Sequence, residues 1–282
     1  MSAAIEKNHD YHMVEPSPWP FVMSAAVLVM MIGAVFFMKG WTPWIFFVGL
    51  AGVLYTMYAW WSDVIKEANN GVDHTPVVQM HHRYGMMLFI ASEVMVFFGF
   101  FWAYFDGFFR FDDVEQAARV LATGGHWPPV GVELFDPFHL PLFNTLILLT
   151  SGTTVTWAHH ALLHNDREGL KWGLVLTVGL GILFTATQLL EYSEAGFLFG
   201  GEGSTMYGAT FFMATGLHGF HVFIGTVFLA VCLFRALRGD FTPERHLGFE
   251  FAAWYWHFVD VVWIFLFASI YVWGSWGVAL NH

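Results

Sequence analysis

Long apolar stretches dominate the chain and alternate with short polar connections. Each stretch is close to the about 20 residues that an α-helix needs to cross the hydrocarbon core of a bilayer, which is about 30 Å thick. The pattern therefore predicts an all-α membrane protein with seven transmembrane helices. The predicted helices are Trp19–Met38, Trp41–Ser62, Arg83–Asp106, Phe138–Leu163, Lys171–Tyr192, Met206–Phe234 and Phe249–Trp276.

Two longer polar connections divide these stretches. Residues 63–82 separate the first two helices from the other five, and Lys66-Glu-Ala-Asn-Asn-Gly71 in this segment is typical of a helix end and a turn. The sequence therefore predicts an N-terminal part at 1–62, a polar linker at 63–82 and a five-helix bundle at 83–282. The connection 107–137 contains Gly124-Gly125-His126-Trp127-Pro128-Pro129 and is too rich in turn residues to be one helix.

Composition supports the membrane class and excludes others. The chain is 57% hydrophobic and 12% charged, whereas soluble domains have about 25% charged residues. The net charge of -11 argues against a nucleic-acid partner. A single cysteine, Cys232, excludes a disulfide within the chain and a thiolate metal cluster, and we interpret it as an inert helix residue.

The distribution of basic residues predicts the orientation, because cytoplasmic loops carry an excess of Lys and Arg. With the N-terminus inside, the inner segments hold Lys7, Lys66, Arg83, Arg167, Lys171, Arg235, Arg238 and Arg245. The outer segments then hold Lys39, Arg110 and Arg119. This predicts the N-terminus inside and the C-terminus outside. The outer segments also hold acidic residues, which are compatible either with a basic partner or with an ordinary solvated surface: Asp106, Asp112, Asp113, Glu115, Glu133, Asp136, Glu194 and Glu202.

A carboxylate stands out within the third apolar stretch. Glu93 is ten residues from Arg83, or about 15 Å along a helix, and so lies near the bilayer centre. A charge at that depth costs about 2.5–3.5 kcal/mol on insertion scales, and such residues normally face protein, water or a partner group. Three interpretations are open: a proton relay, a hydrogen bond to another helix, or a contact with a bound lipid.

Histidines are the other polar residues at membrane depth. His159 lies in the fourth stretch, His218 and His221 in the sixth, and His257 and Asp260 in the seventh. One hypothesis is a metal or haem site, because histidine is a common metal ligand. The other, which we favour, is an interhelical hydrogen-bond network among small residues, in which Asp260 accepts from His257. No metal ligands are predicted in this chain.

Several motifs resemble subunit III of the haem–copper cytochrome c oxidases. The matching segments occur in order along nearly the whole chain, which makes the resemblance far more specific than any one motif. They are His74-Thr-Pro-Val-Val-Gln79, Arg83-Tyr-Gly85, Ser92-Glu93, Gly99-Phe-Phe-Trp-Ala103, Trp127-Pro-Pro129, Pro141-Leu-Phe-Asn144, Thr156-Trp-Ala-His-His160, Ala214-Thr-Gly-Leu-His-Gly-Phe-His221 and Trp254-Tyr-Trp-His-Phe-Val-Asp-Val-Val-Trp263.

The resemblance implies a subunit without a catalytic centre of its own. Haem a, haem a3 and copper would lie in partner subunits, with subunit I packed directly against this chain, subunit II in the same complex and cytochrome c as the substrate. The two-helix and five-helix parts would form a V-shaped cleft for phospholipid that supports sustained turnover and proton uptake, and the cleft would line an oxygen route. The bound lipid or oxygen path would involve Glu93, Arg235, Arg83, Trp61 and His74.

One motif departs from the family pattern. Members commonly read Trp-Trp-Arg-Asp where this chain has Trp60-Trp61-Ser62-Asp63, so Ser62 cannot supply that cation to a headgroup. The alternative function is a stand-alone transporter or a histidine-ligated metal enzyme of the membrane. We expect a bacterial inner membrane, or the mitochondrial inner membrane for an organelle-encoded chain.

Overall fold

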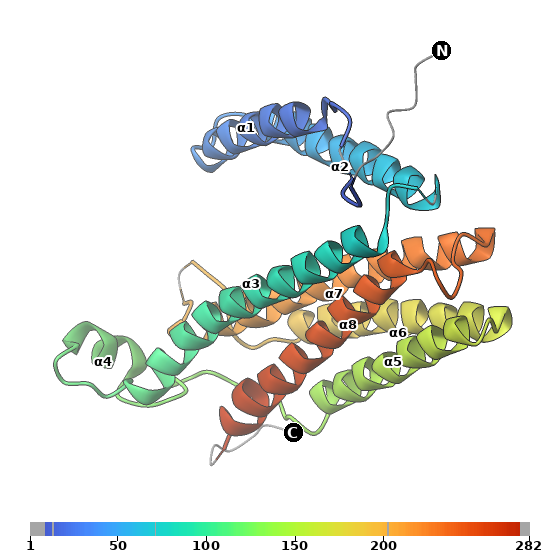
Figure 1. Cartoon of the computed structure of the whole chain (residues 1–282). Helices are drawn as coiled ribbons and strands as arrows, with labels where there is room; N and C mark the ends of the chain where they lie inside the picture. The colour runs from blue at the N-terminus through green and yellow to red at the C-terminus, as the bar shows by residue number, and fades with distance from the viewer. Residues whose placement is uncertain (1–8, 13, 71, 202, 277–282) are drawn as a thin grey trace. The chain divides into compact units, whose positions relative to one another are not determined.

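The computed structural model describes residues 9–12, 14–70, 72–201 and 203–276, and these are mainly helical (Figure 1). Lys7 and Glu202, which entered the charge pattern, lie outside the described residues. A π-helix, η1, directly continues the last α-helix. The elements are α1 (Trp19–Met38), α2 (Trp44–Asn70), α3 (Pro76–Phe109), α4 (Ala117–Thr123), α5 (Leu140–Leu163), α6 (Arg167–Ser193), α7 (Met206–Arg238), α8 (Leu247–Leu266) and η1 (Phe267–Trp273).

Six of the seven predicted spans are helices that are long and apolar enough to cross a membrane. They are α1, α2, α3, α6, α7 and α8 with its π-helical continuation. The helix α5 has 24 residues, which is long enough, but the mean hydropathy of its most apolar 18 residues is lower than that of the other six. Its hydroxyl-bearing side chains explain the shortfall: Thr145, Thr150, Ser151, Thr153, Thr154 and Thr156.

Most residues of the segment predicted as a polar linker, 63–82, lie in helices on either side of a short turn. The helix α2 continues to Asn70, and α3 already begins at Pro76. Lys66 bonds to Asp63 at 2.7 Å, three residues earlier on the same helix, which supports a helical end in water. The indole of Trp19 also donates to Asp63 at 2.7 Å. The polarity of this segment therefore marks a helix leaving the membrane.

Residues 1–84 and 85–282 form two compact units. In the first unit, α1 and α2 pack against each other through glycines. A Cβ at Gly33 would collide with the backbone of Phe46, and one at Gly49 would collide with that of Met30. Without a hydrophobic driving force between helices in lipid, such backbone approach supplies much of the packing.

The second unit is a bundle in which α8 packs against α5 and α7 (Figure 1). Its largest fully buried side chains include Trp256 and Trp263 on α8. The indole of Trp256 donates to Ser151 at 2.8 Å and that of Trp263 to Thr145 at 2.9 Å, both on α5. Buried indole N–H groups usually find a partner, so the α5 hydroxyls allow two tryptophans to enter this core.

Candidate functional site

The intramembrane carboxyl is bonded to a histidine of another helix. Glu93 lies near the middle of the 34-residue α3, and its Oε2 is 2.9 Å from Nε2 of His221 on α7. The side chain of His221 is 7% exposed and that of Glu93 is 21% exposed. Of the three interpretations of Glu93, the structure therefore shows the interhelical hydrogen bond.

The partners of His221 fix the number of protons in the pair. Its Nδ1 is 2.7 Å from the carbonyl oxygen of Leu217, and a carbonyl can accept a hydrogen bond but not donate one. Nδ1 therefore carries a proton. The contact between Nε2 and Glu93 then requires one further proton, either on the imidazole or on the carboxyl. In both states the pair as a whole is neutral, which suits its place at membrane depth.

Aromatic rings surround the pair. The imidazole of His221 lies 5.0 Å from the ring of Phe97, 6.2 Å from that of Tyr255 and 6.2 Å from that of Phe258. The three neighbours supply mainly apolar surface, apart from the hydroxyl of Tyr255. This arrangement can fix α3 to α7 and α8, and it offers no series of polar groups along α3 for proton transfer.

The other predicted polar residues also make contacts within the bundle. His218 is fully buried, and its Nε2 is 3.2 Å from the carbonyl oxygen of Val259 on α8. His257 lies between Asp260, whose Oδ2 is 3.5 Å from its Nδ1, and Thr156 on α5, whose hydroxyl is 3.2 Å from its Nε2. Through these contacts His218 links α7 to α8, and His257 links α8 to α5.

His159 has different surroundings near the end of α5. Its ring lies 5.4 Å from that of His246 and 5.6 Å from that of Phe249. Its Nε2 is buried and has no hydrogen-bond partner among the described residues. The contacts of His159 among the described residues are therefore mainly with other rings, and its structural polar role stays a prediction.

The structure reveals a buried carboxyl that the sequence reasoning missed. Glu191, near the end of α6, is 0% exposed, and its Oε1 accepts from the hydroxyl of Tyr271 on η1 at 2.6 Å. The amide of Gln188 donates to the same oxygen at 3.1 Å. Because residues three apart share a helix face, the pair Gln188 and Glu191 in an apolar stretch was the available signal.

Arg235, predicted to hold a lipid phosphate, makes contacts within the loop after α7. Its guanidinium lies 4.5 Å from the ring centroid of Phe241, and its Nε is 3.6 Å from Asp240. Its side chain is 13% exposed. The guanidinium of the exposed Arg238 stacks over Phe234 at 4.1 Å.

The other three residues of the predicted lipid set, Trp61, His74 and Arg83, belong to the first unit. Trp61 is 59% exposed on α2, and Arg83 is half-buried on α3. His74 precedes α3, and its ring lies 5.1 Å from that of His82. Burial, followed by the charge of His82, lowers the pKa of His74 below its ordinary value.

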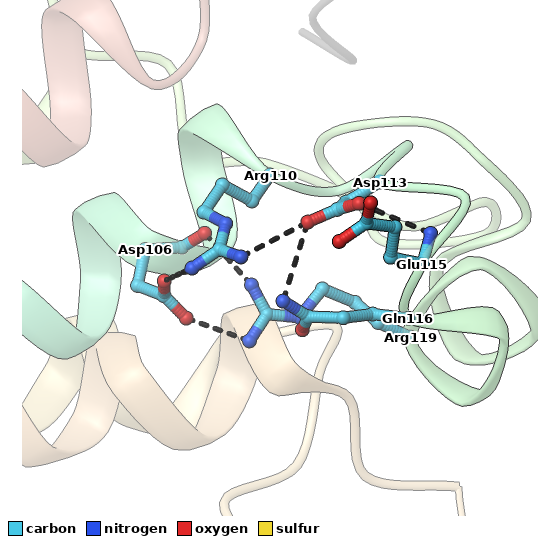
Figure 2. Close-up of polar contacts among 6 residues, drawn as sticks. All are labelled: Asp106, Arg110, Asp113, Glu115, Gln116 and Arg119. Atoms are coloured by element: carbon cyan, nitrogen blue, oxygen red, sulfur yellow. Dashed lines mark hydrogen bonds and ion pairs between the residues drawn. The ribbon is translucent and has the colours of Figure 1, made fainter.

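The last turn of α3 and the segment that follows it carry a cluster of paired charges (Figure 2). Asp106 binds Arg119 at 2.6 Å and Arg110 at 3.3 Å, and Arg110 also binds Asp113 at 3.0 Å. The hydrogen bond from Arg110 lowers the pKa of the Asp113 carboxyl below its usual value. Two carboxylates of the predicted acidic outer surface, Asp106 and Asp113, are therefore paired with the nearby Arg110 and Arg119.

Comparison with known proteins identifies the family. The family model for cytochrome c oxidase subunit III matches residues 9–275. The chain belongs to this family. It is 50% identical over 267 residues to cytochrome c oxidase subunit 3 of Cyprinus carpio, with 95% of this chain and 98% of the relative covered. It is 49% identical over 271 residues to the Arabidopsis thaliana subunit, with the same coverage.

Family membership places this chain in an oxidoreductase complex, in which subunit III is a non-catalytic member. The cofactors of such a complex lie in other subunits. In the described part of the chain, no group of three or more His, Cys, Asp or Glu side chains is arranged to hold a metal ion.

Proposed function

We propose that this subunit supports sustained turnover of a respiratory cytochrome c oxidase, which reduces oxygen to water and translocates protons. The observation that supports this best is the family match over nearly the whole chain, together with a membrane-depth carboxyl that is bonded to an imidazole. Its partners would be the haem-bearing subunit I, in direct contact, and subunit II, with cytochrome c as the substrate of the complex.

The first test is the composition of the purified complex. Affinity purification of the chain from its native membrane, in a mild detergent, should yield haem a and copper in fixed proportion to the chain. Isolated chain, separated from that complex, should contain no stoichiometric iron, copper or zinc. A stand-alone transporter would purify without haem, and a metal enzyme would retain metal until His218, His221 or His257 is changed.

Glu93 and His221 would hold the interior of the five-helix unit together next to bound lipid or an oxygen route. We propose that the pair does not carry pumped protons, because Phe89, Val96 and Phe100 on the same helix offer no successive polar groups. Glu93→Gln should keep the proton-to-electron stoichiometry of reconstituted vesicles close to wild type in the first turnovers. Loss of pumping while electron transfer continues would identify Glu93 as a proton station.

Phospholipid binding is the third part of the proposal. The half-buried Arg235 carries its guanidinium beside the ring of Phe241 near the predicted inner surface, where an arginine can form two hydrogen bonds to phosphate. Arg235→Gln should reduce the phospholipid retained per complex, and Arg238→Gln is the matched exposed control. Equal lipid content in wild type and Arg235→Gln would contradict this role.

Orientation and location complete the proposal. The distribution of basic residues supports an inner N-terminus and an outer C-terminus, with α5 as the seventh span and a lipid cleft as in the family. We propose an inner membrane, bacterial or mitochondrial. Cysteine labelling with an impermeant reagent at positions 139 and 164, at opposite ends of α5, tests both the orientation and the seventh span, since one position should react from each side.

A further inference from the structure

Two exposed histidines lie side by side at the end of α5. His160 is in the last turn of the helix, and His164 is its C-cap residue. Both residues are exposed, and their ring centroids are 4.3 Å apart with an angle of 29° between the ring planes. In the proposed orientation this end of α5 lies at the inner surface of the membrane. The pair therefore belongs to the aqueous boundary and not to the hydrogen-bond network of the bundle interior.

The separation of the two rings matches the span of two nitrogen ligands on one metal ion. Each Zn–N bond is about 2.0–2.1 Å long, so two nitrogens on the same ion lie at most about 4.2 Å apart. Residues four apart share a helix face, and two histidines at this spacing present both imidazoles to one zinc ion in helical sites. Because both side chains are exposed, a rotation of the rings can bring one nitrogen of each to the same ion.

Hydrogen bonding already selects the nitrogen of His164 that would bind the metal. Its Nδ1 is 3.0 Å from the carbonyl oxygen of His160, and a carbonyl accepts but does not donate, so Nδ1 carries a proton. In the neutral imidazole the free lone pair is then on Nε2. A bond from Nδ1–H to a backbone carbonyl commonly orients a histidine that binds a metal through Nε2.

The charges around the end of α5 favour a cation. The C-terminal end of a helix carries a partial negative charge from its last carbonyl groups. The backbone N–H of Asp166 bonds to the carbonyl of Ala161 at 2.8 Å, which holds this carboxylate-bearing residue at the same helix end. The next residue, Arg167, donates to the carbonyl of Phe241 at 2.6 Å, so its guanidinium is engaged with another loop.

We propose that His160 and His164 form a binding site for a divalent cation of the zinc class at the inner end of α5, with water completing the coordination shell. Imidazole suits Zn²⁺, Ni²⁺ and Cu²⁺, whereas Mg²⁺ and Ca²⁺ prefer oxygen ligands. Two protein ligands are fewer than the three or four of resident zinc centres, so the ion exchanges with the solution and a chelator removes it. The site is independent of the proposed function, because it needs only the end of α5.

Modification of histidines with diethyl pyrocarbonate, followed by mass spectrometry of the peptides, tests the site in the intact complex. After a chelator wash, both His160 and His164 should react. Added Zn²⁺ should protect both, and the same concentration of Mg²⁺ should protect neither. His126, an exposed histidine of the loop before α5, is the internal control and should react equally in every sample. In the variant His160→Gln, Zn²⁺ should no longer protect His164.

Equilibrium dialysis gives an independent measure of the bound zinc. The wild-type complex should bind one more exchangeable Zn²⁺ than His160→Gln, whereas His126→Gln should bind as many ions as the wild type. Loss of one ligand should weaken binding at this site by at least about tenfold. If His160→Gln does not assemble, His164→Gln replaces it, with protection measured at His160.

Three results would overturn the proposal. The first is equal reactivity of His160 and His164 in the wild type with and without Zn²⁺. The second is protection of His164 that persists in His160→Gln, which would assign the ion to other ligands. The third is a His164 that does not react before Zn²⁺ is added, because this would show that the pair is covered in the complex.

Discussion

The bond between Glu93 and His221 predicts a clear difference between two substitutions. Glu93→Gln keeps a donor for Nε2 of His221, since the amide N–H can replace the shared proton while Nδ1 stays bonded to Leu217. Glu93→Ala removes the partner and leaves Nε2 without one in a side chain that is 7% exposed. The two variants therefore separate the hydrogen bond from the charge of the carboxyl.

The expected magnitude follows from the membrane setting. Interhelical hydrogen bonds in membrane proteins contribute about 0.6 kcal/mol on average and at most about 1.7 kcal/mol. Leaving a buried polar group unpaired costs about 1–3 kcal/mol. Glu93→Ala should therefore lower the free energy of unfolding by about 1–2 kcal/mol, and Glu93→Gln by less than about 0.6 kcal/mol.

A double-mutant cycle with His221→Leu measures the pair itself. The free energy of unfolding can be followed by tryptophan fluorescence during titration of dodecyl maltoside micelles with dodecyl sulfate. The coupling between Glu93→Ala and His221→Leu should be about 0.6–1.7 kcal/mol. A coupling near zero, or a Gln variant as unstable as the Ala variant, would refute the interpretation of this contact.

Three further substitutions test other parts of the second and first units. Gly152→Ala places a methyl group against the carboxylate of Asp260 on α8 and should lower the free energy of unfolding by about 1–3 kcal/mol. Gly179→Ala, whose added methyl group has nothing within 4 Å, is the control and should change that free energy little. Glu191→Leu leaves the hydroxyl of Tyr271 without its acceptor and should lower the free energy of unfolding by about 1–3 kcal/mol. Glu191→Gln keeps an acceptor oxygen for this hydroxyl and should retain most of the thermal stability. The pKa of His74 is lowered by burial, so folding favours its neutral form, and the resulting stability is complete above about pH 6.5 and declines as the pH falls below it. His74→Gln should reduce the loss of thermal stability as the pH falls below about 6.5, and an unchanged dependence on pH would contradict this.

The sequence predicted the positions of the apolar helices well because membrane thickness imposes a length on each one. The bounds of α1 agree with the prediction at both ends, Trp19 and Met38. The end of α2 and both ends of α3 were predicted too close to the apolar core, because helices extend beyond the apolar stretch where charged residues such as Lys66 support them. The start of α2 is at Trp44, three residues after the predicted one. The hydrophobic pattern marks where the membrane ends, and this is a different point from the end of a helix.

Side-chain partners were harder to predict. The depth of Glu93 indicated that it needs a partner, but its bond to His221 depends on the rotation of α3 and α7 about their axes, which an apolar sequence does not specify. Glu191 was missed because it lies in the last turn of a span, where a carboxylate is usually assigned to the interface. Its complete burial results from Tyr271, which approaches it from η1.

The close contact of α1 with α2 has a consequence for biogenesis. The two helices are joined by the short connection between Met38 and Trp44, and their backbones meet at Gly33 and Gly49. All of these contacts are local in sequence, so the hairpin can leave the translocon and pack as a pair while the ribosome is still synthesising the later helices. A pair that assembles on its own can also be gained or lost as one genetic cassette, without redesign of the helices that follow it.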